Sequence, residues 1–304
     1  MKCHLLRRDS GDRWRAVYQA RQGREACRPP PTPPRPVIVK TAVVCETPGV
    51  RDALLKFPGR TVLSIWAWLA LGLTILVALP IVAVIWLATV RSDPGRYRAG
   101  YAFRKVAVVA QTLNPLWKFT VSGTIPSDPR RPYMVVANHE SFVDILLIAH
   151  LPFEMKWLAK SDFFGFPVIG WMMRMAGDIR LVRSDRGSRG DALTAMRQRL
   201  ADHVSVMVFP EGTRSASGEL GEFRDGAFAV AVEAGVPILP LAVIGTRDAL
   251  VKHDWRFGSS HAEVRVLEPV EVGPGTDVAG LREQVRATIA AALEQLRAER
   301  GGER

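Results

Sequence analysis

The fold and the candidate chemistry of this chain both depend on one stretch, Val135-Val136-Ala137-Asn138-His139-Glu140-Ser141-Phe142-Val143-Asp144. Its first half is an apolar run typical of a buried β-strand, and an apolar helical pattern follows at 145–148. We therefore expect a strand, a turn that carries His139, and a helix for which Ser141 is the N-cap. Residues five apart on a continuous helix point about 140° apart, so His139 can meet Asp144 only from the turn. Asp144 would then hold one ring nitrogen and leave the other free to accept a proton.

The same residues have a simpler interpretation. Ser141 and Asp144 match the S-x-x-D capping box that begins many helices, and His139 would then be an ordinary loop histidine. One histidine and one carboxylate at this spacing do not choose between a general base and a loop residue. The choice depends on the rest of the chain.

Charge is distributed unevenly along the 304 residues. The net charge is +11, but residues 1–60 hold 13 Lys and Arg against 5 Asp and Glu, a net +8 that leaves +3 for the other 244 residues. A nucleic-acid-binding protein would carry a recognisable binding motif or a basic surface interleaved with aromatic residues, and this chain shows neither. We therefore expect no nucleic-acid partner.

Residues 61–90 form an apolar segment of thirty residues without a charged side chain. About 20 apolar residues in a helix cross the hydrocarbon core of a bilayer, so the segment predicts a membrane helix rather than a buried helix of a soluble domain. Pro80 divides the run, which leaves one kinked span and a shallow re-entrant element both open. Basic residues flank it on both sides, so the positive-inside rule gives no clear orientation, and a monotopic element with both flanks in the cytoplasm fits best.

The chain is expected to contain three regions. Residues 1–50 are basic and proline-rich and should be disordered, residues 51–105 should form a membrane-associated element with basic flanks, and residues 106–304 should form an α/β domain. The three cysteines, Cys3, Cys27 and Cys45, lie in the first region without C-x-x-C spacing. They predict neither a disulfide framework nor a zinc site, and they fit a reducing compartment.

From about residue 117 onward, strand-like and helical patterns alternate. The predicted strands cover 118–121, 132–137, 156–158, 178–182, 204–209, 238–244 and 262–267, and the predicted helices cover 141–150, 166–175, 190–203, 225–234 and 278–297. This alternation predicts an α/β fold with a mixed, largely parallel sheet flanked by helices, preceded by the N-terminal hydrophobic membrane helix. In such sheets the functional residues lie beyond the carboxyl ends of the strands.

Three predicted strand ends carry polar side chains. His139 follows one strand, Arg183 follows another, and a third precedes Phe209-Pro210-Glu211-Gly212-Thr213-Arg214-Ser215. In that last loop Pro210 and Gly212 suit a tight turn, and the planar guanidinium of Arg214 can bind a phosphate or a carboxylate. The simpler alternatives are a turn held by an ion pair between Glu211 and Arg214, and a solvent-exposed Arg183.

Together these motifs resemble the 1-acyl-sn-glycerol-3-phosphate acyltransferases, the lysophosphatidic acid acyltransferase type of glycerolipid acyltransferase. The chain contains N-H-x-S-x-x-D at 138–144, G-x-I-x-x-x-R at 177–183, F-P-E-G-T-R-S at 209–215 and V-P-I-x-P at 236–240, in the family's order. The residues that support the motifs are Asn138, Ser141, Pro210, Ser215 and Pro237. The resemblance covers roughly residues 117–270 and excludes the first 50.

The resemblance implies an O-acyltransferase of phospholipid biosynthesis. Its product would be phosphatidic acid, made by transferring an acyl chain from acyl-CoA or acyl carrier protein to the sn-2 hydroxyl of 1-acyl-sn-glycerol 3-phosphate. His139 would be the general base and Asp144 its orienting partner, with the substrate hydroxyl as nucleophile. The phosphate site implied by the family comprises Arg183, Glu211, Gly212, Thr213, Arg214 and Lys160.

The same resemblance implies the partners and the location. We expect a lysophospholipid acceptor, an acyl thioester donor, membrane lipids and, where it is the donor, acyl carrier protein. No metal and no cofactor beyond the thioester co-substrate are expected. The expected location is a bacterial inner (cytoplasmic) membrane, with the active site facing the cytoplasm.

Alternative functions remain open at this point. The acceptor could be another lysophospholipid, glycerol 3-phosphate or a lyso-ornithine lipid, although the arginines favour a phosphate-bearing acceptor. A lipid hydrolase that pairs His139 with Ser141 is a more distant alternative, because the chain lacks the G-x-S-x-G nucleophile elbow. A basic nucleic-acid-binding protein is equally distant.

Overall fold

The strands are β1 (Val39–Lys40), β2 (Trp117–Gly123), β3 (Met134–Ala137), β4 (Met155–Lys160), β5 (Ile179–Leu181), β6 (Ser205–Val208), β7 (Ile238–Ile244) and β8 (Ser260–Val266). They belong to a computed structural model that describes residues 39–40, 59–215, 218–250, 254–273 and 275–302. These strands form one sheet in the order β1-β2-β8-β7-β3-β6-β4-β5. From β7 to β5 every neighbouring pair is parallel, as is the pair β2–β8, whereas β7–β8 and β1–β2 are antiparallel. The predicted mixed, largely parallel sheet is confirmed.

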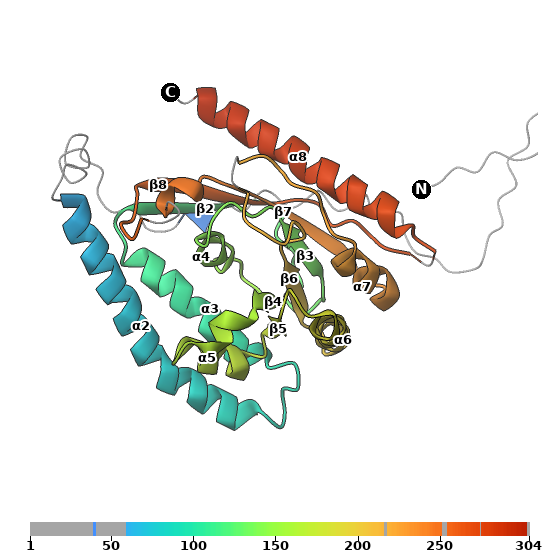
Figure 1. Ribbon diagram of the computed structural model, residues 1–304, viewed down its shortest axis with the longest axis horizontal. Coiled ribbons are helices and arrows are strands. Elements are labelled where there is room, and N and C mark those ends of the chain that lie inside the picture. The colour runs from blue at the N-terminus through green and yellow to red at the C-terminus, as the bar shows by residue number, and fades with distance from the viewer. Residues whose placement is uncertain (1–38, 41–58, 216–217, 251–253, 274, 303–304) are drawn as a thin grey trace, which may run out of the picture. The chain divides into compact units, whose positions relative to one another are not determined.

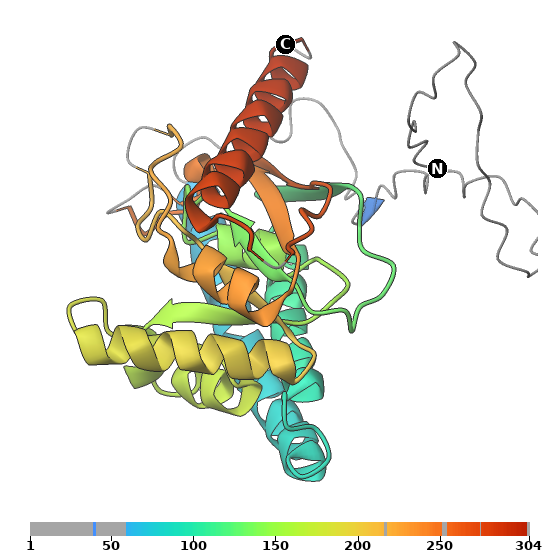
Figure 2. The ribbon, with the colours of Figure 1, turned by 90° about the vertical axis from the view of Figure 1, so that its right-hand side faces the viewer.

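The helices are α2 (Gly59–Thr89), α3 (Tyr97–Thr112), α4 (Asp144–Ile148), α5 (Ile169–Ala176), α6 (Arg186–Ala201), α7 (Gly226–Ala234) and α8 (Val278–Gly302), with short 3₁₀ turns η1 (Ser161–Gly165) and η2 (Arg247–Ala249). They cover both faces of the sheet (Figure 1). Successive side chains of a strand point to opposite faces, so Val135 and Ala137 of β3 pack with α4 while Met134 and Val136 pack with α6, α7 and α8. Figure 2 looks onto the second face, where α6, α7 and α8 lie in front of the sheet.

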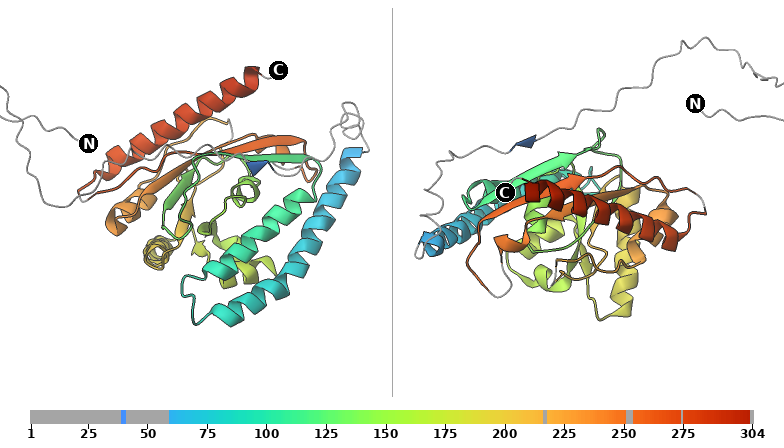
Figure 3. Two further views of the ribbon diagram at one scale, coloured as in Figure 1. Left: turned by 180° about the vertical axis from the view of Figure 1, so that it is seen from behind. Right: turned by 90° about the horizontal axis from the view of Figure 1, so that it is seen from above.

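Helices α2 and α3 lie side by side and pack against α5 (Figure 3). α2 is continuous through Pro80, and among the described residues it is the one helix long and apolar enough to cross a membrane. Many of its large apolar side chains are exposed, including Leu69, Leu73 and Leu87. One end of α2 is attached to the α/β domain, because Arg60 donates to the carbonyl of Phe257 and the Trp68 ring stacks on the Phe257 ring.

Two local features differ from the sequence-based expectations. Helix α4 begins at Asp144 rather than at 141, with Val143 as N-cap, so the prediction of Ser141 as N-cap is wrong. Helix α3 was not predicted, because its Arg104 faces the interior and interrupts an apolar pattern. α3 also runs across residue 105, where the second region was expected to end; the division at residues 50 and 105 stays a prediction. Apart from 39–40, the proline-rich first region and its cysteines lie outside the described residues.

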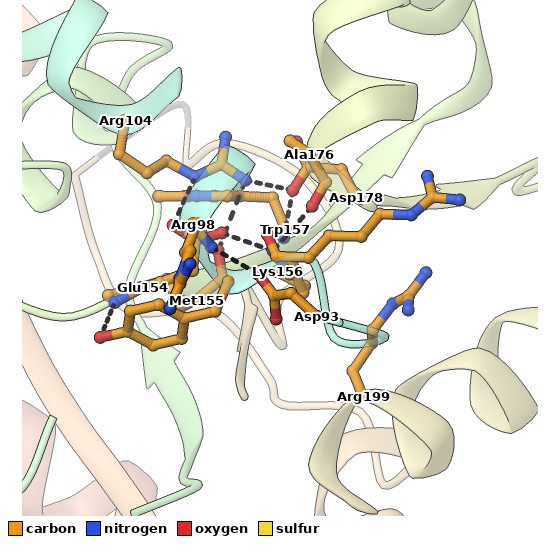
Figure 4. A network of polar contacts seen from close by, with 12 residues as sticks. Asp93, Arg98, Arg104, Glu154, Met155, Lys156, Trp157, Ala176, Asp178 and Arg199 are labelled. Atoms are coloured by element: carbon orange, nitrogen blue, oxygen red, sulfur yellow. Dashed lines mark hydrogen bonds and ion pairs between the residues drawn. The ribbon is translucent and has the colours of Figure 1, made fainter. Parts of the chain in front are cut away.

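A buried network of charged side chains joins α3 to the amino end of β4 (Figure 4). Lys156, which is fully buried, donates from its ammonium to Glu154 and to the carbonyls of Arg96 and Ala176, at 2.9, 2.9 and 2.7 Å. These three acceptors match the three donors of an ammonium. Arg104 completes the network through ion pairs with Asp178 and with Glu154. The network lies at the edge of the sheet opposite the loop that carries His139, because Glu154 precedes its strand and His139 follows its own.

We expect Lys156→Met to destabilise the fold by about 3–5 kcal/mol, because it leaves the buried Glu154 carboxylate without its ammonium. The measurement is thermal or urea unfolding of the purified chain in detergent micelles. Lys160→Met is the matched control on the same strand, since the ion pair of Lys160 with Asp162 is exposed and should contribute less than about 1 kcal/mol. Equal destabilisation by both substitutions would contradict the role of the network.

Candidate active site

His139 and Asp144 meet as the sequence predicts, across the loop between β3 and α4. The ring Nδ1 of His139 lies 2.7 Å from Oδ2 of Asp144. Asp144 is fully buried, and the His139 side chain is 14% exposed. With Nδ1–H donating to the carboxylate, Nε2 is left as the acceptor nitrogen, and it forms no hydrogen bond with any residue that the structure describes.

Asp144 accepts four hydrogen bonds. Besides the His139 ring, its Oδ2 accepts the backbone N–H groups of Glu140 and Ser141 at 2.8 and 3.0 Å, and its Oδ1 accepts the hydroxyl of Thr246. The bond from Ser141 N–H to Asp144 is the one that the carboxylate of an S-x-x-D capping box would accept, although Ser141 is not the N-cap of α4. One carboxylate therefore shapes the turn and orients the imidazole.

The imidazole of His139 is held on its flat side by Phe209. The two rings stack with centroids 3.9 Å apart and an angle of 12° between their planes. Phe209 follows β6, the strand next to β3, so adjacent parallel strands place the two rings at one sheet edge. Packing from Phe209 and the bond to Asp144 together restrict rotation of the ring.

Glu211 holds the backbone of the loop that carries His139. Its Oε1 accepts the N–H of His139 at 2.8 Å, and its Oε2 accepts the N–H of Gly221 at 3.1 Å. The alternative, an ion pair between Glu211 and Arg214, does not form. The Glu211 carboxylate instead accepts hydrogen bonds from backbone N–H groups. Burial raises the pKa of Glu211, and these two amide donors oppose that rise.

The residues that support the motifs form hydrogen bonds that link the loops and strands of the site. The Asn138 amide exchanges two hydrogen bonds of 2.8 Å with the backbone of Val243 in β7. The N–H of Ser215 donates to the carbonyl of His139 at 2.8 Å. Pro210 and Pro237 contribute carbonyls, which accept the N–H groups of Arg224 and Met134. Gly212 adopts φ +72, a conformation that favours glycine, and a side chain there would collide with the guanidinium of Arg224.

The residues expected to bind phosphate lie along the same sheet edge at increasing distance from His139. Thr213 and Arg214 are exposed in the loop after β6, directly beside β3. Arg183 is exposed after β5, three strand spacings or roughly 14 Å from the end of β3. Neither arginine forms an ion pair with another described residue, whereas Lys160 pairs with Asp162. The role of these side chains in phosphate binding stays a prediction.

The sequence analysis gives no role to three residues of this site: Glu140, Phe209 and Thr246. Thr246 follows β7, and the position of a polar residue just beyond a buried strand is the signal that would have found it. Glu140 accepts the N–H of Gly245 at 3.2 Å. Burial, together with the neighbouring carboxylate of Asp144, raises the pKa of Glu140 to about 7. Within the described residues no group of three His, Cys, Asp or Glu side chains gathers in a way that could hold a metal ion.

This chain is similar in sequence to known acyltransferases. The family model described as "Acyltransferase" matches residues 118–244. The chain is 32% identical to a 1-acyl-sn-glycerol-3-phosphate acyltransferase of Chlamydomonas reinhardtii over 75% of this chain and 67% of the relative. The chain belongs to the 1-acyl-sn-glycerol-3-phosphate acyltransferase family. This is a family of O-acyltransferases of phospholipid biosynthesis, and with the exposed apolar helix α2 it supports membrane association.

Other proteins similar to this chain differ in length and in the acceptor that they are named for. The chloroplastic 1-acyl-sn-glycerol-3-phosphate acyltransferase of Arabidopsis thaliana is 35% identical over 60% of this chain, which spans only about half (51%) of that relative. A lyso-ornithine lipid O-acyltransferase of Pseudomonas aeruginosa is 29% identical over 72% of this chain and 89% of the relative. The crystal structure of the acyltransferase PlsC from Thermotoga maritima matches with a TM-score of 0.67 and 27% identity, over 79% of this chain and 96% of that one.

Stability should depend on pH through Glu140. In the folded state the Glu140 carboxyl keeps its proton up to about pH 7, whereas the ordinary pKa of a glutamate is 4.5. The contribution of Glu140 to the free energy of unfolding is therefore fully present below pH 4.5 and is lost as the pH rises toward 7. Because glutamine does not titrate, the Glu140→Gln variant lacks this pH-dependent loss of stability. We expect the stability of the variant relative to wild type to rise between pH 5 and 8 by up to about 3 kcal/mol and to level off above pH 8.

Thermal unfolding at pH 5, 6, 7 and 8 measures this difference. Glu294→Gln is the control, because it removes one carboxylate at an exposed position of α8. A flat difference for Glu140→Gln would contradict the raised pKa.

Proposed function

We propose that this protein transfers an acyl chain from acyl-CoA or acyl carrier protein to the sn-2 hydroxyl of 1-acyl-sn-glycerol 3-phosphate, which yields phosphatidic acid. The observation that carries the proposal is the His139–Asp144 pair, whose remaining ring nitrogen has no protein partner among the described residues. An imidazole oriented in this way is suited to remove a proton from a hydroxyl.

The reaction needs no covalent enzyme intermediate. Nε2 of His139 accepts the proton of the acceptor hydroxyl as its oxygen bonds to the thioester carbonyl carbon. Asp144 stabilises the imidazolium that forms, through the bond at Nδ1. When the tetrahedral intermediate collapses, the C–S bond breaks and the imidazolium returns the proton to the leaving sulfur. The ester product and a free thiol remain.

The phosphate of the acceptor would be held by the loop after β6. Thr213 and Arg214 are exposed there, directly before Ser215, whose N–H donates to the carbonyl of His139. Arg183 would add a second cation from the far side of β4. Anchoring a group that does not react places the hydroxyl within reach of Nε2, and this is how remote binding energy serves catalysis.

The membrane supplies the acceptor and receives the product. Helix α2 exposes apolar side chains along most of its length, so the chain would sit at the lipid surface. We place it at the cytoplasmic face of a bacterial inner membrane, where a soluble thioester donor reaches the site. Of the two donors, acyl carrier protein would in addition be a protein partner.

A lyso-ornithine lipid is the second candidate acceptor, favoured by the similarity to the Pseudomonas aeruginosa O-acyltransferase over 89% of its length. The two acceptors differ in charge. Lysophosphatidic acid carries a phosphate that can bind Arg214 and Arg183, whereas a lyso-ornithine lipid carries no phosphate. Competition between the two acceptors, measured with the purified enzyme, separates the alternatives.

His139→Ala should lower acyl transfer to lysophosphatidic acid by about 10²–10⁴-fold, because the general base is removed. The assay follows labelled acyl thioester into phosphatidic acid in membranes. His203→Asn is the control, since His203 is exposed and precedes β6 at the opposite edge of the sheet. Substantial turnover by His139→Ala would refute the assignment of the base.

Arg214→Ala should mainly raise the KM for lysophosphatidic acid, by about 10- to 100-fold, because hydrogen bonds to a charged group contribute about 1.5–3 kcal/mol. The kcat should fall much less. Arg197→Ala, which removes an exposed arginine of α6 paired with Glu233, should leave both constants unchanged. An unchanged KM for Arg214→Ala would count against the phosphate site, and so would equal use of acceptors with and without phosphate.

A further inference from the structure

The C-terminal helix α8 packs its apolar residues on the sheet and also carries arginines that contact the segment after the F-P-E-G-T-R-S loop. Its buried residues Leu281, Val285 and Ile289 pack on the face of the sheet formed by β3, β6 and β7. Two arginines of the same helix donate instead to backbone carbonyls of residues 218–221, which follow the F-P-E-G-T-R-S loop. None of the four sequence motifs includes this helix.

Arg286 and Arg297 hold residues 218–221 at two points. Nε and Nη2 of Arg286 donate to the carbonyls of Gly221 and Leu220, at 3.0 and 3.2 Å. Nη2 of Arg297 donates to the carbonyl of Gly218 at 2.9 Å. The two arginines are 11 residues apart, about 16 Å along the helix, and they converge on one short segment. The segment is neither helix nor strand, so these guanidinium groups supply donors that secondary structure does not.

Residues 218–221 in turn hold both backbone groups of His139. The N–H of Gly221 donates to Glu211, which accepts the N–H of His139 through its other oxygen. The N–H of Gly218 donates to the hydroxyl of Ser215, whose own N–H donates to the carbonyl of His139. Two chains of hydrogen bonds therefore run from the segment to the N–H and the carbonyl of His139, one on each side of its Cα atom.

Gly221 shows how closely this link is packed. A Cβ atom at that position would lie 2.9 Å from Oε2 of Glu211, which is closer than side-chain carbons approach other atoms. The absence of a side chain lets the backbone N–H reach the carboxylate. Glycine at position 221 therefore allows the hydrogen bond between residues 218–221 and Glu211.

We propose that Arg286, assisted by Arg297, is a positioning residue for acyl transfer: it fixes residues 218–221, and through Glu211 and Ser215 it sets the position of the His139 ring. This inference rests on the proposed function. Arg286 touches neither the reacting atoms nor the imidazole, so its effect is on kcat rather than on substrate binding. A displacement of about 1 Å at a catalytic group can lower the rate about 10²-fold.

The first test compares Arg286→Ala with Arg282→Ala in the full-length protein in detergent micelles. Arg282 lies one turn earlier on α8 and pairs with Asp225 and Glu283, without contacting residues 218–221. We expect Arg286→Ala to lower kcat about 10- to 100-fold with both KM values within about 2-fold of wild type. Arg282→Ala should keep kcat within about 2-fold. Arg286→Lys should recover part of the rate, because one donor remains.

A double-mutant cycle tests whether Arg286 acts through Glu211. If Arg286 acts through Glu211, the loss in Arg286→Ala/Glu211→Gln should be much smaller than the product of the two single losses. Multiplicative losses would overturn the route through Glu211. Should Arg286→Ala fail to fold, Gly221→Ala decides instead, because it pushes on the Glu211 carboxylate while Arg286 is intact, and it should lower kcat selectively.

Amide hydrogen exchange gives a readout that does not depend on the substrate. Arg286→Ala should speed exchange of the His139, Ser215 and Gly221 amides at least about 10-fold, whereas Arg282→Ala should leave them unchanged. A failure of wild type to acylate lysophosphatidic acid would refute the proposed acceptor but would leave this readout intact. The positioning role is overturned if these amides stay protected, if kcat is unchanged, or if only KM changes.

Discussion

The carboxylate of Asp144 joins parts of the chain that are about a hundred residues apart. It accepts donors from its own turn, from the His139 ring and from Thr246, which is 102 residues further along the sequence. A carboxylate has enough lone pairs to accept all of these donors at once. Because it is fully buried, water does not compete for the same positions. The orientation of the imidazole is thus coupled to the pairing of β3 with β7.

A second layer of contacts supports this centre through the backbone. Glu211 and Ser215 hold the N–H and carbonyl of His139, and Asn138 locks the start of the loop to β7. Backbone contacts restrict the position of the ring, while Phe209 and Asp144 restrict its rotation. The two kinds of restraint together hold the imidazole in one position and one orientation.

The opposite edge of the sheet holds a buried network of charged side chains that links helices to strands. There the buried charges of Arg104, Glu154, Lys156 and Asp178 join α3 to β4 and to the residues before β5. α3 packs in turn against the apolar helix α2. The helix pair is therefore attached to the sheet through paired charges as well as apolar packing, and these contacts fix its position relative to the edge that carries His139. Gly100 permits the close approach, since a side chain there would collide with Glu154 and Lys156.

Periodicity and the residues of a single loop encode the sheet and helix pattern, the apolar helix and the pairing of His139 with Asp144, so these features could be predicted from the amino-acid sequence. Most predicted strands and helices are observed within a few residues of their expected bounds. The folded arrangement was needed to show that Thr246, Glu140 and Phe209 join the site, that Glu211 accepts bonds from backbone amides rather than pairing with Arg214, and that Arg104 is buried. These contacts depend on which strands lie side by side, and strand order brings together residues whose local sequences carry no mark of one another.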